Sequence, residues 1–164
     1  MGKILITGVA GLLGSRLADW IIENTDYEVV GIDDLSGGFS ENINRKVHFY
    51  KFNLSDLQAL KGVFEKEKIE IVYHFAAYAA EGLSPFIRKY NYENNLITST
   101  NLITCSIQYD ISRFVFASSM SVYGNKYKPP FNEDLPQAPI DPYAVAKYAV
   151  EMDLEIAHQQ HGLN

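Results

Sequence analysis

Short runs of apolar residues alternate along the 164-residue chain with longer stretches whose apolar residues recur at helical spacing. Apolar runs of about four to eight residues are typical of buried strands, and spacings of three and four residues are typical of helices. The predicted strands are Lys3–Thr7, Tyr27–Asp33, Val47–Phe52, Ile69–Phe75 and Arg113–Ser118. The predicted helices are Leu12–Asn24, Asp56–Lys68, Phe86–Tyr109 and Pro142–His161. This alternation predicts right-handed crossovers and a doubly wound parallel sheet of the α/β class.

Local signals refine several of these elements. The first helix is expected to pack one apolar side against the sheet. The residues of that side are Leu13, Leu17, Trp20 and Ile21. Ser55 precedes the second helix, where its hydroxyl can accept a hydrogen bond from a free backbone amide, so we predict it to be the N-cap. Pro142 suits the first turn of the last helix. The nearly continuous apolar run Ile69–Phe75 predicts a central strand covered on both faces.

Polar, Gly-containing or Pro-rich loops join the elements. The predicted loops are Leu35–Arg45, Ala76–Pro85 and Gly124–Ile140. No internal repeat or domain boundary interrupts the pattern, so residues 1–164 are predicted to form one domain. After the last helix, Gly162-Leu163-Asn164 indicate a helix end that leads toward a sixth strand, and we expect the sheet to lack that strand.

Composition narrows the class of protein. Hydrophobic residues make up 47% of the chain, which argues against disorder, and a net charge of −6 argues against a nucleic-acid partner. The single cysteine, Cys105, excludes an internal disulfide and is expected to be a small buried side chain. With neither a signal peptide nor an apolar stretch of membrane-spanning length, no membrane association is expected and a cytoplasmic location is the default prediction.

Three glycines at spacings of three residues follow the first predicted strand directly. In a turn between strand and helix, Gly8 can adopt a tight conformation, Gly11 lets a ligand approach the backbone, and Gly14 lets the helix pack against the strand. The helix that follows points its free N–H groups at the same place, which favours a pyrophosphate. The glycines could also form a purely structural turn.

An acidic residue strengthens the dinucleotide interpretation. Asp33 ends the second strand about twenty residues beyond the glycines, where a carboxylate accepts hydrogen bonds from the adenosine ribose. A carboxylate there repels a 2′-phosphate, so NAD is favoured over NADP. Asp34 is by default a solvated acid in the turn that follows.

A tyrosine and a lysine lie four residues apart on the last predicted helix. Tyr143 and Lys147 therefore share one face, and a nearby ammonium is expected to lower the pKa of the phenol so that it can act as acid or base. With 11 Tyr residues in the chain, the spacing alone carries little weight. The segment Phe116-Ala117-Ser118-Ser119 supplies the context, because it puts hydroxyls at the carboxyl end of a strand, where open α/β sheets bind ligands.

Other polar residues are expected to be structural. His74 precedes two alanines at a strand end and is predicted to have no catalytic role. His158 and His161 share a helix face without a third ligand, so a solvated helix end is favoured over a metal site. Glu81 could contact a sugar hydroxyl or be a surface acid, and Tyr123 is expected to pack rather than react.

Taken in order, these motifs resemble the N-terminal half of an extended short-chain dehydrogenase/reductase of the NAD-dependent nucleotide-sugar epimerase/dehydratase family, similar to the UDP-glucose 4-epimerases. The motifs are Thr7-Gly8-x-x-Gly11-x-x-Gly14, Asp33, His74-Phe75-Ala76-Ala77, Asn95, Ser118-Ser119, Val122-Tyr123-Gly124 and Pro142-Tyr143-x-x-x-Lys147. The resemblance covers essentially the whole chain. It implies a Rossmann fold without the family's C-terminal strands and substrate domain.

The same resemblance implies NAD as the cofactor. The residues it assigns to NAD are Gly8, Gly11, Leu12, Leu13, Gly14, Asp33, Asp34, Asn53, Leu54, Phe75, Ala76, Ala77, Asn95, Tyr143 and Lys147. Family members often have an acid near the adenine where this chain has Asn53, whose amide oxygen can still accept a hydrogen bond.

For catalysis, the resemblance implies that Tyr143 takes a proton from a sugar hydroxyl and that Lys147 tunes the phenol and contacts the nicotinamide ribose. Ser119 would hold the same sugar oxygen. Hydride transfer to NAD and back would pass through a 4-keto sugar and give the C4 epimer, most simply of a UDP-sugar. The family's dehydratases carry an Asp-Glu pair where this chain has Met120 and Ser121, so an epimerase is favoured.

Alternatives remain open at the level of sequence. Instead of an epimerase, the chain could be part of a nucleotide-sugar dehydratase or reductase of the same family. It could also be a non-catalytic NAD-binding module, which would not be an enzyme. The resemblance also implies a homodimer through the helices around residues 86–109 and 142–161, although their apolar faces could simply cover the sheet. The chain is expected to bind NAD and to have little activity on sugar, and no metal site is expected.

Overall fold

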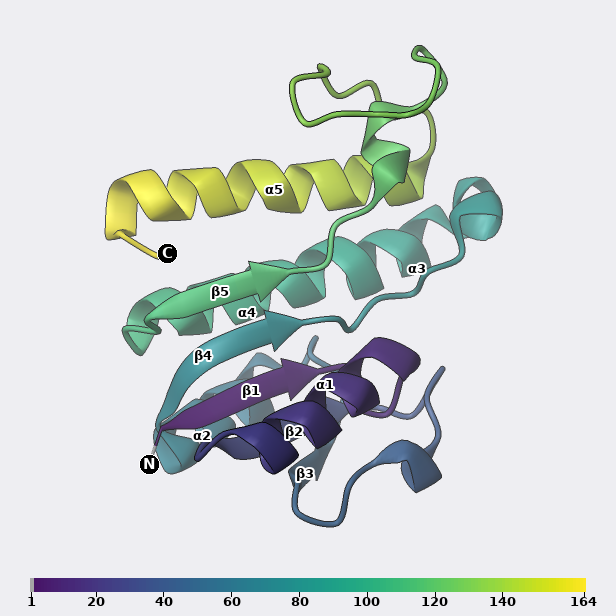
Figure 1. Cartoon of the computed structure of the whole chain (residues 1–164). Coiled ribbons are helices and arrows are strands. Elements are labelled where there is room, and N and C mark those ends of the chain that lie inside the picture. Colours follow the sequence, from purple (N-terminus) through teal and green to yellow (C-terminus); the bar gives the residue numbers. More distant parts are fainter. Residues whose placement is uncertain (1) are drawn as a thin grey trace.

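Five parallel strands form one sheet in the order β3-β2-β1-β4-β5 in the computed structural model, which describes residues 2–164 (Figure 1). The strands are β1 (Lys3–Thr7), β2 (Glu28–Asp33), β3 (His48–Lys51), β4 (Ile69–His74) and β5 (Arg113–Phe116). The chain leaves β1 toward one side of the sheet and returns across it to β4 on the other side. The predicted doubly wound parallel sheet is confirmed, and each predicted strand lies within a few residues of its observed position.

The carboxyl ends of the central strands lie level with one another. Thr7 at the end of β1 is in register with Ile32 on β2 and with His74 on β4. Since the strand order reverses between β1 and β4, this edge is the switch point at which open α/β sheets bind ligands.

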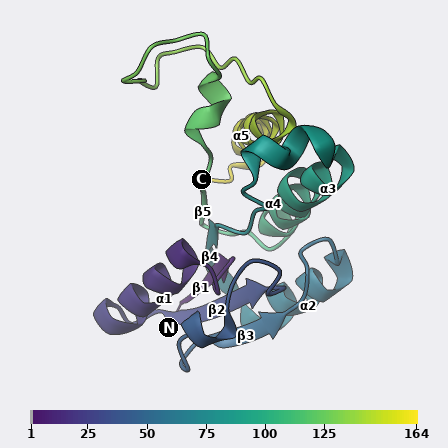
Figure 2. The same cartoon turned by 90° about the vertical axis from the view of Figure 1, so that its right-hand side faces the viewer.

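Helices cover the two faces of the sheet unequally. The helices are α1 (Leu12–Asn24), α2 (Leu57–Glu67), α3 (Arg88–Tyr92), α4 (Thr98–Gln108) and α5 (Pro142–His161). Figure 2 shows α1 on one face and α2, α4 and α5 on the other. Alternate residues of β1 follow this division: Leu5 packs in the cluster under α2, α4 and α5, whereas Ile4 and Ile6 pack in the cluster under α1.

The side of α1 that faces the sheet differs from the prediction. Leu13 and Trp20 are 63% and 58% exposed, and the buried positions are Gly14, Ala18 and Ile21, with Ser15 beside them. Small residues on the buried face let α1 lie close to β1. The larger side chains of Leu13 and Trp20, which were expected on this face, point toward solvent instead. Of the four residues predicted, Ile21 is buried and Leu17 packs against the core.

The predicted cap of α2 is wrong by one residue. The Asp56 carboxylate, and not the Ser55 hydroxyl, accepts the hydrogen bond from the Ala59 amide at 3.0 Å. The Ser55 amide instead donates to the side-chain oxygen of Asn53 at 2.9 Å. Helix α2 therefore begins at Leu57.

The long helix predicted over Phe86–Tyr109 is interrupted. It consists of α3, a π-helical turn η3 (Glu93–Ile97) and α4, and a 3₁₀ turn η2 (Glu81–Phe86) occupies part of the predicted loop before it. The hydroxyls of Thr98, Ser99 and Thr100 each donate to the carbonyl four residues earlier, at 2.7–2.8 Å. Such back-bonding competes with the backbone amides and widens or bends a helix.

Shorter elements complete the chain. A 3₁₀ turn η1 (Ser40–Asn42) lies inside the loop predicted before β3, and η4 (Met120–Tyr123) follows β5. Gly162 ends α5 in the left-handed conformation, and the Phe114 amide donates to the Asn164 carbonyl at 2.7 Å, so the last residues lie beside β5. Cys105 is fully buried, as predicted. No helix within residues 2–164 has the length and apolar character needed to cross a membrane.

Candidate functional site

A cleft opens at the carboxyl edge of the sheet, where β1, β2 and β4 end. The predicted cofactor residues that line it are Gly8, Gly11, Asp33, Asp34, Asn53, Leu54, Phe75, Ala76 and Ala77. They come from segments far apart in the sequence, and only the fold brings them together. Other residues of the wall were not predicted, among them Tyr78, Tyr90, Asn94 and Thr98.

The glycine turn at the floor of the cleft leaves no room for side chains at two positions. Gly8 has φ of +72°, and a Cβ there would lie 2.7 Å from the Ala76 amide nitrogen. A Cβ on Gly14 would lie 2.2 Å from the Gly8 carbonyl oxygen. The turn thus keeps α1 tight against the strand ends.

The N-terminus of α1 is available to an anion. Gly11 is its N-cap and provides no side-chain hydrogen bond, so the first backbone amides of the helix have no capping partner. Leu12 and Leu13 contribute these amides, whereas their side chains are 74% and 63% exposed and lie outside the cleft wall. A helix N-terminus of this kind binds phosphate groups, so the turn fits a pyrophosphate.

Asp33 is held rigidly beside the glycine turn. Its two carboxylate oxygens accept hydrogen bonds from the Ala10 amide at 3.0 Å and from the Leu35 amide at 2.8 Å. A carboxylate offers about four acceptor positions, so two remain for hydroxyl groups of a ligand. The arrangement fits recognition of a ribose diol.

Asn53 both donates and accepts hydrogen bonds at the cleft. Its amide nitrogen donates to Asp34 at 2.7 Å and to Asn94 at 3.2 Å, and its amide oxygen already accepts from Ser55. Burial alone would raise the pKa of Asp34, but hydrogen bonds from Ser36 and Asn53 outweigh it and lower that pKa. Asp34 is therefore an ordered, ionised acid of the cleft rather than a freely solvated one.

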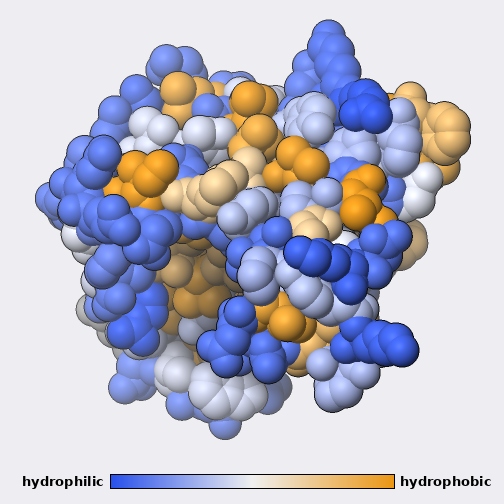
Figure 3. Space-filling model, turned by 90° about the horizontal axis from the view of Figure 1, so that it is seen from above, coloured by the Kyte–Doolittle hydropathy of each residue, from blue (hydrophilic) through white to orange (hydrophobic). Residues whose placement is uncertain are grey.

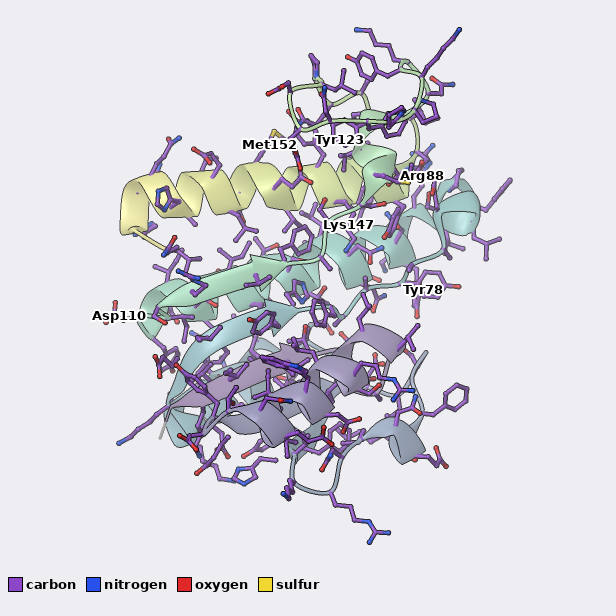
Figure 4. The ribbon with its side chains drawn as sticks, viewed as in Figure 1. Tyr78, Arg88, Asp110, Tyr123, Lys147 and Met152 are labelled. Atoms are coloured by element: carbon purple, nitrogen blue, oxygen red, sulfur yellow. The ribbon has the colours of Figure 1, made fainter. Side chains whose placement is uncertain are left out.

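Asn95 lies behind the cleft and not in its wall. Its side chain is buried and binds both backbone groups of Tyr78, at 2.8 and 3.2 Å, and the Asn91 side chain at 2.8 Å. This amide supports the loop after β4, and Tyr78 of that loop reaches the cleft (Figure 4). The neighbouring residue Asn94 lines the cleft.

The three residues assigned to catalysis meet between α5 and the exit of β5. Lys147 donates to the Ala117 carbonyl at 2.8 Å, and its nitrogen lies 4.6 Å from the centre of the Phe116 ring and 5.8 Å from that of Tyr143. Figure 4 shows Lys147 extending from α5 toward this segment. Ser119 caps η4 by accepting from the Ser121 amide. All three lie outside the residues that line the cleft.

Burial controls the pKa values of the pair on α5. It lowers the pKa of Lys147 to about 8, a shift that the Glu151 carboxylate partly offsets. It also raises the pKa of Tyr143, with the Ser119 hydroxyl acting in the opposite direction and Glu81 and Asp141 adding to the increase. The expected lowering of the phenol pKa is therefore wrong for this structure, because burial outweighs the hydrogen bond from Ser119.

His74 has a structural position, as predicted. It is 1% exposed and lies between the Thr7 hydroxyl at 2.7 Å and the Ser99 hydroxyl at 2.8 Å. Because Ser99 donates its proton to the Asn95 carbonyl, Nε2 of His74 must donate and Nδ1 must accept from Thr7. Burial, together with the charge of Lys147, lowers the pKa of His74 to about 3, so the ring stays neutral.

Two further residues position the N-terminus of α5. The backbone amide of Tyr143 donates to the Ser84 hydroxyl at 3.2 Å, and the side-chain amide of Asn91 donates to the Pro142 carbonyl at 2.9 Å. Both side chains are buried. Their partners lie more than fifty residues away in sequence, so no local pattern could have identified them.

The remaining candidates lie at the periphery. Glu81 is exposed on η2, Tyr123 packs on Phe131 with ring centres 5.5 Å apart, and exposed His158 meets the Leu163 carbonyl at 2.9 Å. Within residues 2–164, no three His, Cys, Asp or Glu side chains are grouped so that they could hold a metal ion.

Comparisons with known proteins agree with this geometry. The sequence matches the NAD dependent epimerase/dehydratase family over residues 4–164. It is 36% identical over 162 residues to a UDP-glucose 4-epimerase of Bacillus subtilis, covering 94% of this chain and 48% of that protein.

Solved structures give the same result. A UDP-glucose 4-epimerase of Thermotoga maritima with UDP-glucose superposes with a TM-score of 0.94 at 37% identity, covering 98% of this chain and 52% of the other. A Thermus thermophilus UDP-glucose 4-epimerase in complex with NAD gives 0.93 at 31% identity, with 98% and 52% covered. The chain thus spans about half the length of the relatives it matches. It belongs to the NAD dependent epimerase/dehydratase family.

Proposed function

We propose that the chain is the NAD-binding part of a nucleotide-sugar 4-epimerase that acts on a UDP-sugar. The observation that carries this proposal is the placement of Ser119, Tyr143 and Lys147 at the same edge of the sheet as a cleft that fits a dinucleotide. Relatives described as UDP-glucose 4-epimerases, one solved with UDP-glucose and another with NAD, support it.

The cofactor would lie along the cleft. The amides at the start of α1 would hold the pyrophosphate over Gly8 and Gly11, and Asp33 would accept hydrogen bonds from the adenosine ribose. Asp34, Asn53 and Leu54 would surround the adenine. When bound, NAD supplies a ring that takes up and returns a hydride.

The chain's own residues would move the proton. Tyr143, as its phenolate, is the group that would take the proton from the sugar C4 hydroxyl, and the phenol so formed would later return that proton. Lys147, aimed at the Ala117 carbonyl, would supply positive charge next to the phenolate, and Ser119 would hydrogen-bond the sugar oxygen. Oxidation at C4 would leave a 4-keto sugar, and reduction from its other face would give the epimer.

The residues after Ser119 favour an epimerase over a dehydratase. Elimination of water requires an acid and a base near the sugar. Met120 is 68% exposed and cannot carry a proton, and the Ser121 hydroxyl donates to Ser119 at 2.9 Å. Neither residue supplies the carboxyl groups that an elimination would use.

Calorimetric titration with NAD and an assay of UDP-glucose conversion test this proposal. We expect one NAD per chain and slow formation of UDP-galactose that Tyr143→Phe abolishes, since the chain spans about half the length of its relatives. Failure to bind NAD would contradict the proposal. A net absorbance change at the nicotinamide band with substrate would indicate a reductase, and NAD binding with no conversion at any concentration would indicate a binding module.

We also propose that α5 forms a homodimer contact. Val145, Met152 and Ile156 are 40%, 46% and 48% exposed at helical spacing on α5. Figure 4 shows Met152 on the side of α5 away from the sheet, and Figure 3, which looks onto this face, shows apolar side chains in a row among polar ones. Two such faces related by a two-fold axis would cover each other.

Sedimentation velocity tests the dimer. We expect the unaltered chain to sediment as a dimer and Met152→Glu to sediment as a monomer with unchanged helix content. Phe39→Ser is the control, because Phe39 is also apolar and exposed but lies far along the chain from α5. A monomeric unaltered chain at all concentrations would refute the contact.

A further inference from the structure

Two side-chain contacts tie the exit of β5 to one face of α5. Lys147 donates to the Ala117 carbonyl at 2.8 Å, and the hydroxyl of Ser118 donates to the Glu151 carboxylate. Lys147 and Glu151 are four residues apart, so they stand one above the other on the helix. The next residue after this double contact is Ser119.

Glu151 also acts on Lys147 through its charge. The groups that face the buried ammonium are neutral His74 from β4, the Phe116 ring from β5, and Tyr143 and Glu151 from α5 itself. Among them, Glu151 is the one whose negative charge stabilises the charged form of Lys147, against the effect of burial.

We propose that Glu151 is a positioning residue for the site: by accepting the Ser118 hydroxyl, it holds the segment 117–119 against α5, so that Lys147 stays extended and Ser119 stays beside Tyr143. The inference rests on the proposed function, because it assumes that Lys147 and Ser119 serve a bound dinucleotide and sugar. Glu151 does not need to touch either ligand.

The pH dependence of NAD affinity separates positioning from a merely structural contact. Charged Lys147 would bind the nicotinamide ribose more tightly than the neutral amine, so affinity should fall as pH rises through the pKa of Lys147, about 8. Glu151→Gln keeps the size of the side chain but removes the charge that raises this pKa. The midpoint of the fall should therefore move to lower pH, with affinity at pH 8 reduced about threefold to tenfold.

Two further variants complete the experiment. Ser118→Ala removes the hydrogen bond but keeps the Glu151 charge, so NAD affinity should fall while the midpoint of its pH dependence stays in place. Because Ser118 is exposed, this variant should fold even if Glu151→Gln folds poorly. Glu155→Gln, one turn further along α5 and exposed, is the matched control and should leave both quantities unchanged.

Calorimetric titrations with NAD from about pH 6 to pH 10 give both readouts without turnover of sugar, and circular dichroism reports folding. The proposal is overturned if Glu151→Gln has the midpoint and affinity of Glu155→Gln, or if Ser118→Ala binds NAD as tightly as the unaltered chain. Absence of NAD binding by the unaltered chain would overturn the proposed function instead.

Discussion

The missing Cβ atom of Gly14 sets how closely α1 approaches the turn after β1. We expect Gly14→Ala to lower the free energy of unfolding by about 1–3 kcal/mol and to weaken NAD binding, because the new methyl group would lie 2.2 Å from the Gly8 carbonyl oxygen. Urea denaturation and calorimetry measure the two effects.

Gly62→Ala is the matched control for that substitution. Gly62 lies in α2 with open space where a Cβ would be, so alanine there should stabilise the chain by about 0.5–1 kcal/mol. Equal stability of the two variants would show that the contact at Gly14 does not constrain the turn.

Single residues were predictable where the local chain decides their role. The glycines, Asp33 and His74 lie where their sequence context indicated. The orientation of the Asn53 amide was not predictable, because it depends on Asp34 and Asn94 from two other segments. The pKa of Tyr143 depends in the same way on tertiary burial.

At the scale of elements, a polar cluster joins β1, β3 and α2 at the edge of the sheet opposite the cleft. Glu67 is 5% exposed at its side chain and binds Lys3 at 2.7 Å, with the Tyr50 hydroxyl as a second donor. Burial alone would raise the pKa of Glu67, but these hydrogen bonds lower it from 4.5 to about 2.

The lowered pKa predicts how stability depends on pH. A carboxyl group whose pKa falls on folding stabilises the native state above its unfolded pKa, and this contribution is lost as pH falls from 4.5 toward about 2. Glu67→Gln should therefore cost about 2–3 kcal/mol near neutral pH, and the difference should shrink in that acidic window. Denaturation at several pH values measures it, with exposed Glu23→Gln as the control. A constant difference at all pH values would contradict this account.

Element boundaries were predictable where local signals are clear: an apolar run marks β1, and Pro142 and Gly162 mark the two ends of α5. The break between α3 and α4 was not, because it depends on hydroxyls that bond backward and on Asn95, which turns inward to hold Tyr78. Periodicity alone continues a helix through such a segment.

At the scale of the whole molecule, NAD should stabilise the fold, because the cleft joins the ends of β1, β2 and β4. Ligand at about a hundredfold excess over its dissociation constant adds about 2.7 kcal/mol to the free energy of unfolding. NADP should add less, because the Asp33 carboxylate would face its 2′-phosphate.

Thermal denaturation with each nucleotide measures this preference. Asp33→Ser should bring the increases in melting temperature caused by NAD and by NADP closer together. Because Asp33 also binds the Ala10 and Leu35 amides, the substitution can change stability by itself, so each increase is measured against the same variant without nucleotide. Equal shifts by the two nucleotides in the unaltered chain would refute the assignment of Asp33.

The sequence by itself determined the parallel sheet, the glycine turn at the end of β1 and the pair on α5, because each depends on residues within a few positions of one another. Tertiary structure alone decided which face of α1 is buried, which way Asn53 points, how Ser84 and Asn91 hold the start of α5, and which residue Glu151 contacts. These outcomes depend on the space and the hydrogen-bond partners that distant segments supply, and no local pattern records them.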